Sequence, residues 1–173
     1  MLCLFLEFQH HQQYFYLFFS SSTDPWQPVE RKYRVTRQLL ETFYDAPPEG
    51  IILQTHSDSI QEDHERIVEL AQRCDLRVHL SIEGDYDRLS GLPPPPCSVE
   101  DRLRLIEDFS QAGISVVACL APLFPLRDPH QFFSRLVNAG ARAAVIDHFI
   151  EGDGTSNGYR TLKTPLPEAM LKT

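Results

Sequence analysis

The chain has 173 residues, of which 42% are hydrophobic and 23% are charged, a balance that suits one foldable domain of ordinary size. Its formal net charge of −8 argues against a general binder of nucleic acid or membrane surfaces, because attraction to phosphate needs a basic face. No basic leader, cleavage site or run of ~18 apolar residues is present, so we expect a soluble, cytoplasmic protein that binds no membrane.

Two residue types qualify this first interpretation. A cluster of basic residues is compatible with a local basic groove despite the acidic total. The cluster consists of Arg31, Lys32, Arg34 and Arg37. The cysteines are separated by long gaps and form no C-x-x-C pair, which indicates free thiols and not a disulfide frame or a zinc site. They are Cys3, Cys74, Cys97 and Cys119.

The first strand–helix unit begins after residues 1–13, a leader that matches no element. The apolar, aromatic run Tyr14–Phe19 predicts a buried strand, which ends at three serines. Residues Glu30–Tyr44 place apolar side chains near helical spacing, and Ala46–Gly50 ends that helix with prolines and glycine.

Two further units follow with the same alternation. Ile51–Leu53 predicts a strand, and a helix is expected from about Glu62 to Arg73. Val78–Ile82 predicts the next strand, after which a loop passes through four prolines, residues 93–96.

The last units carry clear helix signals. Ser98 and Asp101 have the spacing of an N-terminal cap, and Gly113 predicts the end of that helix. Strands are expected at Ile114–Leu120 and Ala143–Ile146, on either side of a helix at Pro129–Asn138. Residues 151–173 read as a loop-rich tail.

Five strands separated by single helices predict an α/β protein with a parallel sheet and right-handed crossovers. We interpret residues 14–150 as part of a (β/α) barrel. An open, doubly wound sheet is the alternative, and periodicity does not decide between the two.

Three strands end in polar motifs, which are Ser22-Thr23-Asp24, Thr55-His56-Ser57 and Ser81-Ile82-Glu83. The carboxyl ends of parallel strands open to a shared mouth, so these groups are expected to form one site. Each motif alone is as well explained by capping of the helix that follows it.

Other motifs favour plain structural explanations. His10-His11 has the character of solvated terminal histidines. Residues 152–158 resemble the start of a calcium loop, but Thr164 stands at the twelfth position, where such a loop requires a bidentate glutamate. Asp147 and His148 form a candidate acid–base pair, although a local hydrogen-bonding role is the commoner one for such a pair. No glycine cradle for a nucleotide occurs.

One segment is specific enough to suggest a family. Ser22–Arg31, continued by Arg34–Glu41, resembles the T-D-P-[YW]-Q-P-x-E-R…T-R-x-x-L-E signature of radical SAM proteins related to spore photoproduct lyase. Ile51–Ser57, His79–Ile82 and 112–125 resemble that family's later strand ends, in family order. Together these motifs cover residues 14 to 150.

The resemblance implies a partial (β/α)₆ barrel and a [4Fe-4S] cluster that cleaves S-adenosylmethionine to a 5′-deoxyadenosyl radical. It places Thr23 and Asp24 beside the methionine moiety and His56 where a lysine often contacts the carboxylate. Ser81 is then expected at the ribose or carboxylate, and Ala121 on the adenosine side. Hydroxyls and a carboxylate can hold an amino-acid zwitterion through charge-assisted bonds.

The family's C-x-x-x-C-x-x-C motif, which lies upstream of the T-D-P strand, does not occur in this sequence. Cys3 alone cannot hold a cluster. We therefore expect an N-terminally truncated fragment without the first strand and helix, inactive alone, with no metal bound; a non-catalytic binding or assembly module is the alternative.

The substrate is unknown, with nucleic acid suggested by family analogy, although Ser21 at the place of a cysteine hydrogen donor argues against thymine-dimer repair. The uncovered strand Tyr14–Phe19 predicts self-association through a sheet edge.

Overall fold

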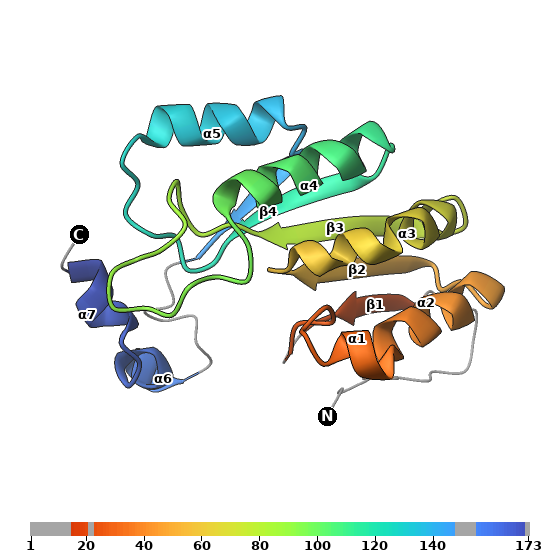
Figure 1. Cartoon of the computed structure of the whole chain (residues 1–173), viewed down its shortest axis with the longest axis horizontal. Coiled ribbons are helices and arrows are strands. Elements are labelled where there is room, and N and C mark those ends of the chain that lie inside the picture. Colours follow the sequence, from red (N-terminus) through yellow and green to blue (C-terminus); the bar gives the residue numbers. More distant parts are fainter. Residues whose placement is uncertain (1–14, 21–22, 148–154, 172–173) are drawn as a thin grey trace.

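The computed structural model describes residues 15–20, 23–147 and 155–171, and its described strands form one all-parallel sheet (Figure 1). The strands run in the spatial order β1-β2-β3-β4-β5. This confirms the α/β class and the parallel sheet. Among the described strands the order contains no reversal, a succession that is compatible with a barrel wall. The strands are β1 (Tyr16–Phe19), β2 (Gly50–Thr55), β3 (Asp75–Ser81), β4 (Ser115–Leu120) and β5 (Ala143–Ile146).

Helices cover one face of this sheet and create the core. Figure 1 shows α2 (Val35–Asp45), α3 (His64–Ala71) and α4 (Val99–Gln111) over the same side, with α5 (Pro129–Asn138) beyond them. Leu53, Val78 and Val116 are neighbours in register on the helix side, and all three are fully buried. Residues one position further along point to the opposite face, because side chains alternate along a strand.

Helix α4 confirms the cap predicted from the sequence. The Ser98 hydroxyl accepts a hydrogen bond from the Asp101 backbone N–H at 3.0 Å, and the Asp101 carboxylate accepts one from the Ser98 backbone N–H at 3.3 Å. Gly113 follows the helix with a φ of +85°, a left-handed conformation that glycine adopts without strain.

Two predicted helices differ in the structure. The helix expected over Glu30–Tyr44 is broken into α1 (Glu30–Tyr33) and α2, because Arg34 takes a left-handed conformation with φ 53° and ψ 35°. The segment expected as one helix from Glu62 begins as the 3₁₀ helix η1 (Asp58–Asp63) before α3. The Ser57 hydroxyl starts η1 by accepting from the Ser59 backbone N–H.

The tail expected to be loop-rich contains short helices among its described residues. These are η2 (Ser156–Gly158), α6 (Tyr159–Leu162) and α7 (Leu166–Leu171). Ala169 of α7 is buried and lies beside Gly91, where an added side-chain carbon would contact the Ala169 methyl group at 3.7 Å. The tail therefore packs on the loop between β3 and α4.

Strand β1 is an edge of the sheet as the structure describes it. It pairs with β2, and its open-face side chains Tyr16 and Phe18 are 60% and 49% exposed. The Tyr16 ring lies over Gly50, where any side chain would clash with it, which explains the glycine at the start of β2. Tyr14, included in the predicted strand, lies outside the described residues.

Candidate functional site

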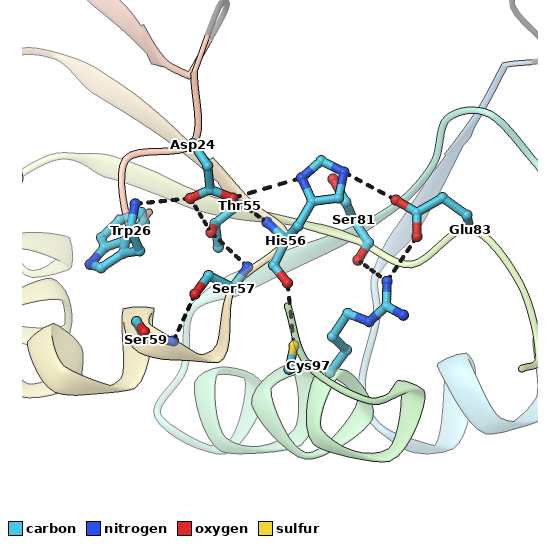
Figure 2. A network of polar contacts seen from close by, with 10 residues as sticks. Asp24, Trp26, Thr55, His56, Ser57, Ser59, Ser81, Glu83 and Cys97 are labelled. Atoms are coloured by element: carbon cyan, nitrogen blue, oxygen red, sulfur yellow. Dashed lines mark hydrogen bonds and ion pairs between the residues drawn. The ribbon is translucent and has the colours of Figure 1, made fainter. Parts of the chain in front are cut away.

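The polar groups that follow the strands lie at one edge of the sheet, at the carboxyl ends of β1 to β4. Asp24 follows β1, His56 follows β2, Ser81 ends β3 with Glu83 just beyond, and Ala121 follows β4. Figure 2 shows Asp24, His56 and Glu83 joined by polar contacts across this mouth. Parallel strands deliver these residues to a common place because all their chains run in one direction.

Asp24 is fixed by four contacts from the segments around it. Its Oδ1 accepts from the Trp26 backbone N–H at 2.8 Å and from the Thr55 hydroxyl at 2.7 Å. Its Oδ2 accepts from the His56 backbone N–H at 2.8 Å and lies 3.7 Å from the imidazole Nδ1 of His56. Burial raises the pKa of Asp24, but the bonds from His56, Thr55 and Trp26 outweigh it and hold that pKa below its usual range. Asp24 is therefore a carboxylate at neutral pH.

His56 lies between two carboxylates. Its Nε2 is 3.1 Å from Oε1 of Glu83, on the side of the ring opposite Asp24. Hydrogen bonds and charge from Asp24 and Glu83 raise the pKa of His56 to about 9, against the opposing effect of burial. The ring is 46% exposed. His56 is thus a cation at neutral pH that a ligand can still reach.

Glu83 forms an ion pair with a buried arginine. Arg102 of α4 is 2% exposed and donates from one terminal nitrogen to Oε2 of Glu83 at 2.8 Å and to the backbone carbonyl of Ser81 at 3.1 Å. Burial raises the pKa of Glu83, but His56 and Arg102 together lower it further than burial raises it. The network of Asp24, His56, Glu83 and Arg102, called the mouth network below, has no net charge in this state.

Arg102 was absent from the residues expected at the site, and Glu83 was named only as part of a strand-end motif. A signal for Arg102 exists in the sequence. Helical spacing aligns it with the buried residues Val99, Ile106 and Phe109 of α4. A charged residue within a buried helical stripe requires a partner, and such a partner belongs to another segment.

The other expected residues have different surroundings. Thr23 is exposed at the rim, and Ala121 is half-buried and joined to Pro122 by a cis peptide bond. Ser81 is buried, with its backbone carbonyl bonded to Arg102. The contacts of the mouth network therefore run through Asp24 and His56, while Thr23, Ser81 and Ala121 border it.

The described cysteines do not form a set that fits an iron–sulfur cluster. Cys74 precedes β3 at the opposite end of that strand from the mouth, whereas Cys119 lies in β4 and Cys97 donates to the His56 carbonyl at 3.3 Å. Burial raises the pKa of all three thiols, for Cys97 and Cys119 to about 11. Cluster ligation needs several converging thiolates, which these groups do not supply.

Some motifs noted in the sequence fall outside the described residues. They are Cys3, His10-His11, His148 and the first three residues of the loop 152–158. Within the part of the chain that is described, no three His, Cys, Asp or Glu side chains gather with the arrangement of a metal site. No helix in that part is both long enough and apolar enough to cross a membrane.

Comparison with protein-family models found no match for this sequence, and comparisons with curated proteins and with solved structures found none either.

Proposed function

We propose that this chain is a partial (β/α) barrel of the radical SAM type, related to the spore photoproduct lyase-like proteins, and that its mouth binds S-adenosylmethionine. The sequence motifs and the sequential parallel sheet support this proposal together. Nucleic acid as the final substrate rests on the resemblance alone.

The observation that carries the proposal is the charge pattern at the mouth. S-adenosylmethionine presents an amino-acid zwitterion, with a carboxylate and an ammonium group on one carbon. The half-exposed His56 cation offers a partner for the carboxylate, and Asp24 and Glu83 beside it supply negative charge for the ammonium. A mouth network without net charge matches such a ligand better than it matches a simple anion or cation.

Radical formation needs the cluster as well as S-adenosylmethionine, since the cluster supplies the electron that cleaves the sulfonium bond. The described cysteines do not fit that role, so we assign binding and orientation of the ligand to this chain and no redox step. His56 holds the carboxylate, and the fixed Asp24 keeps the imidazole protonated and oriented.

Trp26 gives a direct test, because it is the only tryptophan and its backbone bonds Asp24. We expect S-adenosylmethionine to change its fluorescence saturably, with calorimetry giving the same dissociation constant. His56→Ala should weaken binding at least tenfold, which corresponds to about 1.4 kcal/mol for a charged hydrogen bond. His130→Ala removes an exposed histidine of α5 and serves as the matched control. Equal affinity of the His56→Ala variant and the parent would contradict the assignment.

A second candidate is a non-catalytic binding or assembly module. The hydrogen bonds of Asp24 favour this candidate. Its two carboxylate oxygens accept three internal hydrogen bonds, which gives Asp24 a largely structural role. A folded, cooperative chain that binds neither S-adenosylmethionine nor methionine in the same titration would support this candidate over the first.

A further inference from the structure

A separate cavity of about 180 Å³ lies beside the mouth, where the break between α1 and α2 faces η1. Three arginines and Ser59 line it, together with three carboxylates and Trp26. This volume is well above what one water molecule needs and gives room for a small tetrahedral anion. The arginines are Arg31, Arg34 and Arg37.

Two of the three carboxylates are already bound to internal donors. Asp63 is buried and accepts from the Arg37 Nε at 2.7 Å and from the Trp26 indole N–H at 3.0 Å. Glu30 accepts from the Arg37 backbone N–H at 3.2 Å. The Arg37 guanidinium offsets the charge of Asp63, whereas the Glu30 carboxylate is held in place by a neutral amide and keeps its negative charge.

The third carboxylate belongs to a weak pair. Glu62 lies 3.3 Å from the Arg31 Nε, and both side chains are largely exposed. Exposed pairs of this kind contribute little to stability and exchange readily with solvent ions. Arg31 also donates to the Ser59 hydroxyl at 3.4 Å, a long bond that directs its guanidinium toward the cavity wall.

The three arginines and three carboxylates of the lining balance in charge, and Arg31 and Arg37 are paired with Glu62 and Asp63. Arg34 is the third arginine of the lining. Its left-handed backbone, at φ 53°, suits glycine far better than arginine. The residue at this position is nevertheless a long cation, and it lines the cavity. No ion pair or side-chain hydrogen bond engages its guanidinium among the described residues. A strained backbone at a cavity wall is a known mark of sites under functional constraint.

We propose that this cavity binds a phosphate monoester, with Arg31, Arg34 and Ser59 contacting its oxygens. The planar guanidinium group matches phosphate with two parallel hydrogen bonds, and Arg37 adds positive potential while Asp63 holds it in place. The small volume and the acidic chain, with a net charge of −8, favour one terminal phosphate over a nucleic-acid backbone. The site does not depend on S-adenosylmethionine binding at the mouth.

The test is titration of the full chain with inorganic phosphate by calorimetry at constant ionic strength. Arg34→Gln should weaken binding at least tenfold, while Lys32→Gln, the same charge change two residues away and outside the cavity, should change it less than twofold. Arg34→Gly should lose phosphate binding to the same extent while unfolding at the same temperature as the parent or higher, which separates the lost guanidinium from misfolding.

Three results overturn the proposal. The first is no phosphate binding by the folded parent, and the second is equal binding by the parent and Arg34→Gln. The third is Arg34-dependent binding of a single-stranded oligonucleotide without terminal phosphates when inorganic phosphate does not bind. The affinity for S-adenosylmethionine, measured in the same variants, should not change. The phosphate proposal and the S-adenosylmethionine proposal can therefore fail independently of each other.

Discussion

Replacement of His56 by glutamine tests the electrostatics of the mouth through stability. The pKa of His56 in the folded chain is about 9, and the ordinary histidine value is about 6.5. A difference of about 2.5 units sets a ceiling of about 3.4 kcal/mol on the stabilisation by the protonated ring. Because the ring is 46% exposed, solvent screens its pairs with Asp24 and Glu83, and we expect about 1 kcal/mol in practice.

The direction of the pH dependence follows from the raised pKa. A cation that binds its proton more tightly in the folded state contributes its full stabilisation below about pH 6.5 and loses it as pH rises through about 9. The free energy of unfolding of the parent should therefore exceed that of His56→Gln by about 1 kcal/mol near pH 6. The difference should vanish above about pH 9.5.

Urea unfolding at several pH values measures this difference, and NMR titration of the His56 ring measures its pKa directly. His130→Gln, on the exposed face of α5, is the control for loss of a histidine outside the mouth network. A His56 that titrates near its ordinary value, or a stability difference that stays constant with pH, would refute the mouth network as described.

Three further predictions follow from the same contacts. Arg102→Met should lower the free energy of unfolding by about 3 kcal/mol in urea titrations, since it leaves the Glu83 carboxylate buried without its arginine, and a second change, Glu83→Gln, should recover part of the loss. Anaerobic iron–sulfur reconstitution of this chain should yield no [4Fe-4S] cluster, and a stoichiometric cluster signal in electron paramagnetic resonance would contradict our assignment of the thiols. Light scattering at micromolar concentration should show self-association that Phe18→Lys reduces, because a charge on the exposed β1 edge opposes pairing; a monodisperse parent would argue against an open edge.

The strand–helix alternation could be predicted because each element carries its own local signal. Pro129–Asn138 and Ala143–Ile146 were expected at the bounds that the structure shows. A proline in the first turn and a glycine after the helix mark α5. The apolar run of β4 is that of a buried strand, whereas the apolar run of β5 forms a strand whose side chains are exposed. Local chemistry of this kind is visible in one sequence.

The break at Arg34 could not be predicted, because no local signal in the sequence marks it. The spacing of apolar residues continues through it, and arginine has a good helix propensity. What stops the helix is a set of bonds to other parts of the chain. The Thr36 hydroxyl donates to the Pro25 carbonyl at 2.7 Å, and Arg37 reaches Asp63 in η1. These long-range contacts decide where α2 begins, and the local spacing of apolar residues carries no information about them.

The segment that carries the family resemblance also has a structural explanation that is independent of any cofactor. Asp24 fixes the ends of β1 and β2 to each other, the Pro25 carbonyl accepts from Thr36 of α2, and the Trp26 indole bonds the buried Asp63. These contacts tie the first strand–helix unit to the second at the mouth. The fold therefore needs these residues whether or not the mouth binds a ligand. His56 and Arg34 differ in this respect, because neither the packing of the core nor the shape of the backbone requires a cation at their positions. Substitutions of these two side chains, compared with substitutions of Asp24 or Trp26, therefore test ligand binding with a smaller effect on folding.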